Sequence, residues 1–235
     1  MRWAKKEEKN YARRYKNEYH LLRALFQAFA VYILAYPFLK LVYNIKREGT
    51  ENIPKGGHYI YAGNHVSMFD PLLVSFGVRK PIVYMAKKEL FESNGMLSWM
   101  IKRLGAFSVN REKPEIGTFK TVKEVFKTDW PLGIFPQGGI KENKKIENIE
   151  RGFVAIAKNA KADIIPVSIS GFEGYSKKPF SQNVRVKIGK PISCELPIDE
   201  IIYQWAKQIC DDTGFENCMS PADFVEDIKL QKISV

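Results

Sequence analysis

His65 and Asp70 stand five positions apart in the run from Asn64 to Pro71, a pairing that can make a catalytic base. Five residues of one regular helix turn a side chain by about 140°, so these two side chains can meet only across a bend. A carboxylate bonded to one ring nitrogen fixes the imidazole tautomer and leaves the other nitrogen free to take a proton. The spacing therefore predicts a general base made of His65 and Asp70.

The residues around the pair are expected to supply that bend. Residues 59–62 are predicted to form a short strand, and a helix is predicted to begin with Asp70 at the N-cap and Pro71 at the first helical position. His65 would then lie on the loop between them. A structural interpretation stays open, in which Asp70 is only a cap worth about 1 kcal/mol and His65 is an ordinary loop residue.

Further segments carry residues suited to a site. The apolar run 104–109 is followed closely by Arg111, and a charged residue just after a strand favours a site over a solvated surface position. Another run ends in a turn with Gly138 and Gly139, where the missing side chains let backbone N–H groups approach a developing oxyanion. A simple turn would explain the two glycines as well. Residues 164–169 have the composition of a buried strand.

With these segments in order, the chain resembles the glycerolipid acyltransferase family, above all the bacterial 1-acylglycerol-3-phosphate (lysophosphatidic acid) acyltransferases. That family carries the blocks Asn-His-x4-Asp, Gly-x-Phe-x3-Arg and Phe-Pro-Glu-Gly-Thr-Arg, followed by a hydrophobic-Pro-hydrophobic strand. The resemblance covers residues 48–191. It implies that His65 is the general base, that Asp70 orients it, and that Arg111 contacts the phosphate of the acceptor.

The third block departs from the family pattern. Gln137, Gly139 and Ile140 stand where the family has Glu, Thr and Arg. Losing the Arg removes a planar group of five donors suited to phosphate, and Gln in place of Glu removes a charge while keeping the shape. The candidates to replace the lost positive charge are Lys141, Lys144, Lys145 and Arg151. Arg151 is preferred, because it precedes a predicted helix start that favours anions.

Strand-like runs alternate with helical patterns along most of the chain. The expected strands are 41–47, 59–63, 82–86, 106–109, 132–135, 164–169 and 184–188, and the expected helices are 71–76, 96–103, 115–127, 149–159 and 198–209. This alternation predicts an α/β fold, with a mixed sheet and helices on both faces. Residues 41–235 are expected to form one catalytic domain, in which sites gather at the strand ends.

Residues 1–40 are expected to form a separate membrane-associating helical segment. Residues 24–39 contain no charged residue over 16 positions, bracketed by Arg23 and Lys40. As a helix they would span roughly 24 Å, short of the roughly 30 Å hydrocarbon core, and Pro37 should bend or end the helix early. An interfacial anchor is therefore predicted, with these side chains entering the acyl layer: Leu25, Phe26, Phe29, Tyr32, Ile33 and Tyr36. Packing against the catalytic domain is the alternative.

The formal net charge of +11 favours an anionic partner. A membrane surface is favoured over nucleic acid, because no nucleic-acid-binding motif is present and an apolar run follows the basic start of the chain. The expected location is the cytoplasmic face of the cell membrane, with peripheral or monotopic attachment. No metal site is expected from the three histidines and three cysteines, whose spacing matches no ligand pattern, and no cofactor is required.

The predicted activity is transfer of a fatty acyl group from an acyl thioester, of acyl carrier protein or coenzyme A, to the hydroxyl of a lysolipid. The most favoured acceptor is 1-acylglycerol-3-phosphate, which would give phosphatidic acid. Direct transfer is favoured over an acyl-enzyme, since no Gly-x-Ser-x-Gly elbow is present. The altered third block keeps two alternatives open, another acceptor such as lyso-ornithine lipid, and a non-catalytic basic protein that binds membranes.

Overall fold

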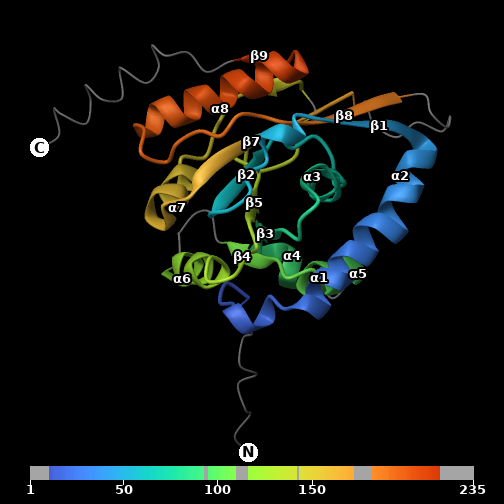
Figure 1. Cartoon of the computed structure of the whole chain (residues 1–235), viewed down its shortest axis with the longest axis vertical. Coiled ribbons are helices and arrows are strands. Elements are labelled where there is room, and N and C mark those ends of the chain that lie inside the picture. Colours follow the sequence, from blue (N-terminus) through green and yellow to red (C-terminus); the bar gives the residue numbers. More distant parts are fainter. Residues whose placement is uncertain (1–10, 93–94, 110–115, 142, 172–181, 218–235) are drawn as a thin grey trace, which may run out of the picture.

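The computed structural model describes residues 11–92, 95–109, 116–141, 143–171 and 182–217. Its centre is a seven-stranded sheet built from β1 (Tyr43–Glu48), β2 (Tyr59–Gly63), β3 (Val83–Lys87), β4 (Phe107–Val109), β5 (Leu132–Ile134), β7 (Asp163–Ser170) and β8 (Gln182–Ile188). The strand order is β1-β8-β7-β2-β5-β3-β4 (Figure 1). β7 and β8 pair antiparallel and the other neighbours in this sheet pair parallel, so the predicted mixed sheet is confirmed.

Helices occupy most of the connections between these strands, and one more helix follows the last strand. The longer ones are α3 (Asp70–Val78), α5 (Met96–Arg103), α6 (Ile116–Val125), α7 (Gly152–Ala160) and α8 (Ile198–Thr213), and short 3₁₀ turns lie at Lys16–Glu18 and Thr50–Asn52. Every predicted strand and helix has a counterpart in the structure. The short helix α4 (Lys88–Glu92), and a separate pair formed by β6 (Lys145–Ile146) and β9 (Glu216–Asn217), were not predicted.

Different helices cover the two faces of the sheet. Ile60 and Ala62 of β2 contribute to a core completed by α6, α7 and α8, with the fully buried Trp205 at its centre. The intervening Tyr61 contributes to a second core on the opposite face, together with Leu73 of α3. This alternation follows from the two-residue period of a strand, and burial on both faces is typical of a central parallel strand.

The N-terminal helix is longer than the sequence predicts. It runs without interruption over 22 residues, Leu21–Val42, as α1 (Leu21–Ala28), a π-helical stretch (Phe29–Ala35) and α2 (Tyr36–Val42). The helix does not end early at Pro37, which was one of the two expected outcomes. The N–H of Tyr36 donates to the carbonyl of Val31, five residues back, and this wider turn accommodates the proline ring that a regular α-helix would reject. Within the described residues, this one helix is long and apolar enough to cross a membrane.

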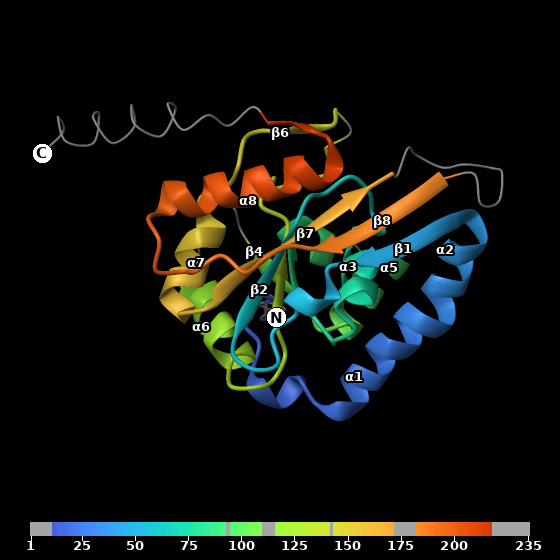
Figure 2. The same ribbon diagram turned by 45° about the horizontal axis from the view of Figure 1, so that its top comes forward.

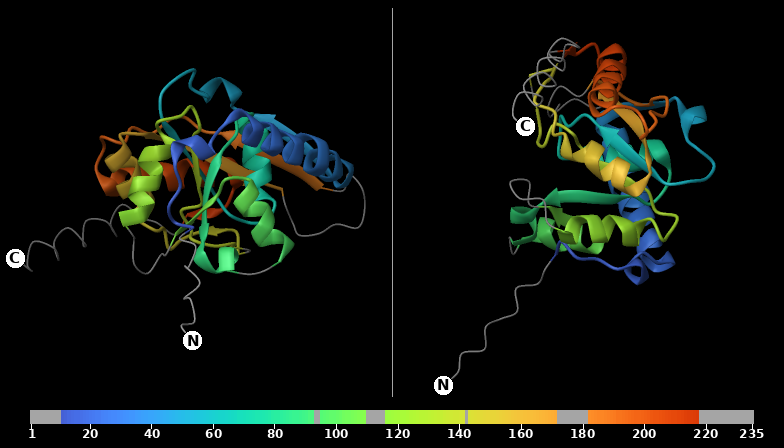
Figure 3. Two further views of the ribbon diagram at one scale, coloured as in Figure 1. Left: turned by 90° about the horizontal axis from the view of Figure 1, so that it is seen from below. Right: turned by 90° about the vertical axis from the view of Figure 1, so that its left-hand side faces the viewer.

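One face of this helix is docked on the body of the protein, as Figures 2 and 3 show for the segment in blue. The buried Gln27 donates from Nε2 to the carbonyl of Ile82 over 2.9 Å and accepts the N–H of Ile82 at Oε1 over 3.0 Å. The Tyr36 ring stacks on Phe76 of α3 at 4.4 Å between centroids, and Tyr32 also packs against Phe76. Both tyrosines therefore face the protein, which corrects the expectation that they enter the acyl layer.

The connections that follow β2 and β5 leave the sheet on opposite faces. β2 and β5 are parallel neighbours, with Ala62 opposite Ile134. The chain leaves β2 toward α3 on one face and leaves β5 toward α7 on the other. Neighbouring parallel strands whose connections go to opposite faces leave a crevice outside their carboxyl ends, where α/β proteins commonly bind ligands.

Candidate active site

The loop that follows β2 begins with a buried asparagine. The side chain of Asn64 donates to the carbonyl of Ile169 over 2.9 Å and accepts the N–H of the same residue over 2.8 Å. It therefore takes the place of a strand residue beside β7. The end of β2 is held as well, because the indole N–H of Trp205 on α8 donates to the carbonyl of Ala62 over 2.9 Å. These bonds fix the point from which the loop departs.

His65 and Asp70 are in direct contact across this loop. Nδ1 of His65 lies 2.7 Å from Oδ2 of Asp70, and the same oxygen accepts the backbone N–H groups of Val66 over 2.6 Å and Ser67 over 2.8 Å. Asp70 is the first residue of α3 and Phe69 is its N-cap, so the expectation that Asp70 is the cap is wrong. Its carboxylate reaches back into the loop and orders the turn that carries His65.

The surroundings of the pair favour a defined imidazole tautomer. The Asp70 side chain is fully buried, whereas the His65 side chain keeps 18% of its surface exposed. Burial raises the pKa of the Asp70 carboxyl, and its hydrogen bonds with His65 and the two backbone N–H groups oppose that rise. A carboxylate facing Nδ1 holds a proton on that nitrogen, which leaves Nε2 as the atom that can accept one.

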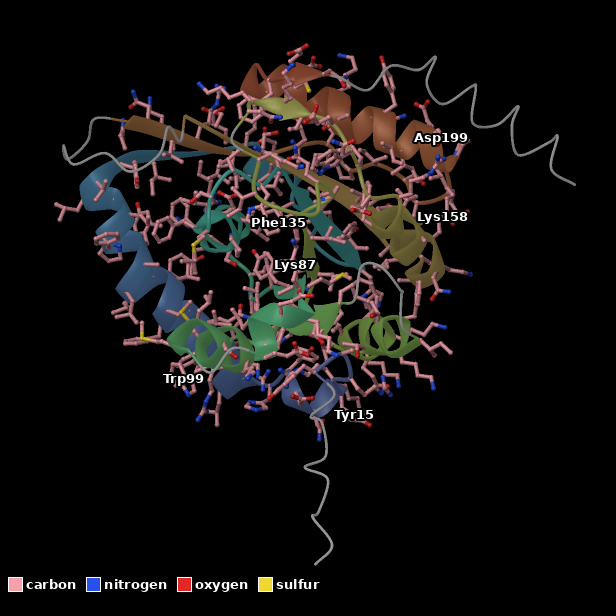
Figure 4. All side chains as sticks on the ribbon, turned by 180° about the vertical axis from the view of Figure 1, so that it is seen from behind. Tyr15, Lys87, Trp99, Phe135, Lys158 and Asp199 are labelled. Carbon is pink, nitrogen blue, oxygen red and sulfur yellow. The ribbon has the colours of Figure 1, made fainter. Side chains whose placement is uncertain are left out.

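An aromatic stack supports the imidazole from its flat side. The ring of Phe135, just beyond β5, lies 4.2 Å from the His65 ring between centroids, at an interplanar angle of 22°. Tyr84 stacks behind Phe135 at 6.1 Å, and its hydroxyl donates to the carbonyl of Pro71 over 2.7 Å. Figure 4 shows Phe135 near the middle of the molecule. The stack and Asp70 together leave the imidazole little freedom to rotate.

Residues 135–140, which match the third block of the family pattern, form a tight turn beside His65. Gly138 has a φ of +71°, a conformation that favours glycine, and its N–H donates to the carbonyl of Phe135 over 3.0 Å. The Gly138 N–H is therefore used within the turn. In the described part of the chain, the N–H groups of Gly139 and Ile140 make no backbone hydrogen bond, and a Cβ added at Gly139 would meet nothing within 4 Å. The open side of the turn lies at Gly139.

Residues 64–69, which join β2 to α3 and carry His65, are called the dyad loop below. A cavity of about 220 Å³ opens next to this loop, at the carboxyl end of β7. Its lining includes Val66, Lys144, Ser170, Thr213 and Phe215. The lining of this cavity is mainly polar, and Val66 places it one residue from His65.

The remaining predicted site residues lie elsewhere. Arg111 falls outside the described residues. Arg151 precedes α7, as expected, but its guanidinium forms an ion pair with Asp199 at the start of α8, and Figure 4 shows Asp199 at the outer end of that helix, away from Phe135. Among the described residues, no cluster of three or more His, Cys, Asp or Glu side chains could hold a metal ion. The structure thus assembles His65, Asp70 and the 135–139 turn, and Arg151 has a protein partner.

Comparisons with known proteins agree with this geometry. A family model described as Acyltransferase matches residues 44–170 of the chain. The 1-acyl-sn-glycerol-3-phosphate acyltransferase of Streptococcus pneumoniae is 32% identical over 152 residues, which are 63% of this chain and 56% of that relative. The Bacillus subtilis protein of the same name is 31% identical over 156 residues, which are 66% of this chain and 76% of that relative.

The fold has a counterpart among solved structures. The 1-acyl-sn-glycerophosphate (LPA) acyltransferase PlsC from Thermotoga maritima superimposes with a TM-score of 0.58 at 22% identity, covering 74% of this chain and 72% of that one. At this identity the likeness concerns the fold. The family model, in contrast, spans more than half of the chain and includes the dyad, the aromatic stack and the glycine turn. On that match, this chain belongs to the acyltransferase family.

Proposed function

We propose that the protein is an O-acyltransferase that moves a fatty acyl group from an acyl thioester to the hydroxyl of 1-acylglycerol-3-phosphate, giving phosphatidic acid. The observation that carries the proposal is the contact between His65 Nδ1 and Asp70 Oδ2 at 2.7 Å, with the imidazole edge exposed beside an open glycine turn. The names of the two relatives give this acceptor. The pair of His65 and Asp70 supplies the general base that such a transfer requires.

The reaction proceeds by direct attack. As the acceptor hydroxyl attacks the thioester carbonyl, Nε2 of His65 takes the hydroxyl proton and Asp70 stabilises the imidazolium. The N–H groups of Gly139 and Ile140 are the donors available for the tetrahedral oxyanion. When the C–S bond breaks, the thiolate leaves and takes the proton from the imidazolium, so the base returns to its starting state. No cofactor takes part in this sequence.

Residues near the dyad suit a phosphate-bearing acceptor. The cavity beside Val66 is lined by Lys144 and Ser170, whose residue types bind phosphate, whereas the Thr213 hydroxyl already donates to the carbonyl of Ile209. Arg111 is the further candidate, by its match to the family's second block. Arg151 is a weaker candidate than its position in the sequence suggests, because recruiting it would require breaking its ion pair with Asp199.

The N-terminal helix suits a monotopic attachment to the cytoplasmic face of the cell membrane. Its outward face carries Leu25, Phe29, Ile33 and Phe38, each between 48% and 61% exposed. A contiguous exposed apolar face of this kind marks an interaction surface. Crossing the membrane would require the helix to leave its docking site, and Gln27 would lose the bonds that it makes there with the protein backbone. The helix can instead remain docked while its outer face enters the acyl layer.

An acyl-transfer assay with the purified full chain tests the proposal. The acceptors are 1-acylglycerol-3-phosphate, lyso-ornithine lipid and a neutral lysolipid, and each is offered with acyl carrier protein and coenzyme A thioesters. We expect turnover with the phosphate-bearing acceptor to exceed that with the others. Preference for lyso-ornithine lipid would reassign the acceptor, a result that Ile140 in place of the family's Arg would explain. Absence of turnover with every pair would support a non-catalytic, membrane-binding role.

A further inference from the structure

Gln137 makes contacts on both sides of its side-chain amide. This residue is 4% exposed. Its Oε1 accepts the backbone N–H of His65 over 3.3 Å, and its Nε2 donates to the carbonyl of Lys145 over 3.1 Å. The N–H of Lys141 donates in turn to the carbonyl of His65 over 2.7 Å. Both backbone groups of His65 are therefore bonded to the 137–145 segment, and one of the two bonds runs through the Gln137 side chain.

These contacts complete the ordering of the dyad loop. The N–H of His65 is held by Gln137, and the next two N–H groups, of Val66 and Ser67, are held by Asp70. Each of three consecutive amides thus donates to a buried side chain. Asp70 sets the orientation of the imidazole, whereas Gln137 ties the backbone of His65 to the segment that contains Gly139. The separation between the base and the open glycine turn therefore depends on the Gln137 bond together with the bond from Lys141 to the His65 carbonyl.

An amide is the group that these contacts require. Its oxygen accepts and its nitrogen donates, so it satisfies an N–H on one side and a carbonyl on the other. An ionised carboxylate of the same shape accepts only, which would leave the Lys145 carbonyl without its donor and set a negative charge against it in a buried position. The glutamine that departs from the family block therefore matches the carbonyl that it meets here.

We propose that Gln137 is a positioning residue for the acyl transfer, and that it acts by holding His65 at a fixed distance from the oxyanion donors at Gly139 and Ile140. This inference rests on the proposed function. A catalytic group displaced by about 1 Å can lose up to about 100-fold in rate, so loosening the tie should lower kcat more than it raises KM.

Gln137→Glu and Gln137→Met test this role in the full chain, with a water-soluble short-chain acceptor. At pH 8 both variants should have a kcat lower than the wild type by about 10-fold to 100-fold. Lowering the pH protonates the buried glutamic acid, whose O–H can then donate to the Lys145 carbonyl while its other oxygen accepts from His65. The ratio of Gln137→Glu to wild-type kcat should therefore rise as the pH falls from 9 to 6, and the Gln137→Met ratio should stay flat.

The ratio isolates position 137 because both proteins share the other titrating groups around it. Those groups lie on the dyad loop, on the segment after the block and on β9: His65, Asp70, Lys141, Lys144, Lys145, Glu150 and Glu216. Gln208→Glu is the matched control, since Gln208 on α8 also accepts an N–H and donates to a carbonyl, both of Lys190. Its kcat should equal the wild-type value at every pH.

Amide hydrogen exchange across residues 64–67 gives a second readout that needs no turnover. Gln137→Met should speed this exchange, and if that variant does not fold, Gln137→Asn, which is too short to make both bonds, takes its place. Wild-type kcat in Gln137→Glu at pH 8, a flat ratio from pH 9 to 6, or unchanged exchange would each overturn the positioning role. If the wild type transfers no acyl group, the proposed function fails, and the exchange still decides whether Gln137 holds the loop.

Discussion

At the scale of single residues, the dyad gives the most direct prediction. His65→Ala should reduce acyl transfer by about 10²–10⁴-fold, because general-base assistance is worth that much. Folding should change little, since the imidazole is partly exposed and packs on one side against Phe135. Turnover and thermal unfolding of the variant check both statements. A variant that keeps more than a tenth of wild-type turnover would rule out His65 as the base.

Asp70→Asn should separate activity from stability. The folded pKa of Asp70 is raised by burial, so the folded state binds this proton more tightly than the unfolded state does. The stability from protonated Asp70 is therefore complete below the unfolded pKa of about 4 and is lost as the pH rises through the raised folded value. The asparagine variant has no such loss.

Urea unfolding of both proteins between pH 4 and pH 8 measures this difference. Relative to the wild type, Asp70→Asn should become progressively more stable as the pH rises, although it loses activity because Asn does not hold the required tautomer. If the difference in unfolding free energy stays constant over this range, burial does not raise the pKa of Asp70 in the folded protein.

Gly139→Ala tests whether substrate occupies the open side of the turn. The added methyl group meets no protein atom within 4 Å and the backbone of Gly139 is not in the left-handed region, so stability should be unchanged or slightly higher. Acyl transfer should fall, because the methyl group would occupy space near the oxyanion donors. Gly95→Ala, at an equally open position, is the control and should leave turnover at the wild-type level. Wild-type kinetics of Gly139→Ala would place the reacting carbonyl elsewhere.

The sequence could predict this site only in part. The contact between His65 and Asp70 follows from five residues of local chain and a helix start, so spacing was sufficient. Gln137 bonds to His65 across 72 positions and Asn64 bonds to Ile169 across 105 positions, and only the folded sheet brings these pairs together. The resemblance flagged Gln137 as a departure, but it could not reveal that a carbonyl would face it.

At the scale of elements, the N-terminal helix gives a prediction about membranes. Phe29→Ser combined with Ile33→Ser should weaken binding to vesicles at least about 10-fold, because each side chain contributes roughly 1.5–3 kcal/mol when it enters an apolar layer. Both positions are exposed, at 48% and 61%, so the fold should be retained. Vesicle co-sedimentation and thermal unfolding measure the two effects.

The control for this experiment is Ile198→Ser, which removes an exposed apolar side chain from α8. It should leave vesicle binding unchanged. Deleting residues 1–40 would be a poorer test, since Val31 and Leu39 are buried against the domain and their loss would uncover its core. Equal vesicle binding by the double variant and the wild type would make the exposed face irrelevant to the membrane.

Element prediction succeeded where the hydrophobic pattern is strong. The strand 164–169 is a short, continuous, buried run, and the helix 198–209 has a buried face with the helical period, so tertiary packing and local pattern agree. The N-terminal helix was judged from its uncharged residues alone. It docks on the domain through Gln27 and Tyr36, and the turn that accepts Pro37 is π-helical, which no local pattern indicates.

At the scale of the whole molecule, basic groups and aromatic rings lie together near the start of the N-terminal helix. The start of the N-terminal helix contacts α5 through the rings of Phe26 and Trp99, and the Arg103 guanidinium lies over the Trp99 ring at 5.8 Å. Trp99 and Tyr15 lie toward the same end in Figure 4. Basic groups beside exposed aromatic rings suit the headgroup level of an anionic bilayer, where each basic residue contributes about 1 kcal/mol.

Salt should therefore separate membrane attachment from chemistry. Raising the ionic strength from about 0.1 M to about 1 M shortens the screening length from roughly 10 Å to roughly 3 Å, which removes most of the attraction between a chain of net charge +11 and an anionic surface. Turnover of acceptor embedded in anionic vesicles should fall, and turnover in neutral vesicles should change little. A water-soluble acceptor without a phosphate group serves as the control, because its encounter with His65 depends on neither surface. If salt slows that control as strongly as the vesicle reaction, the charge acts on the chemistry of the site and not on attachment.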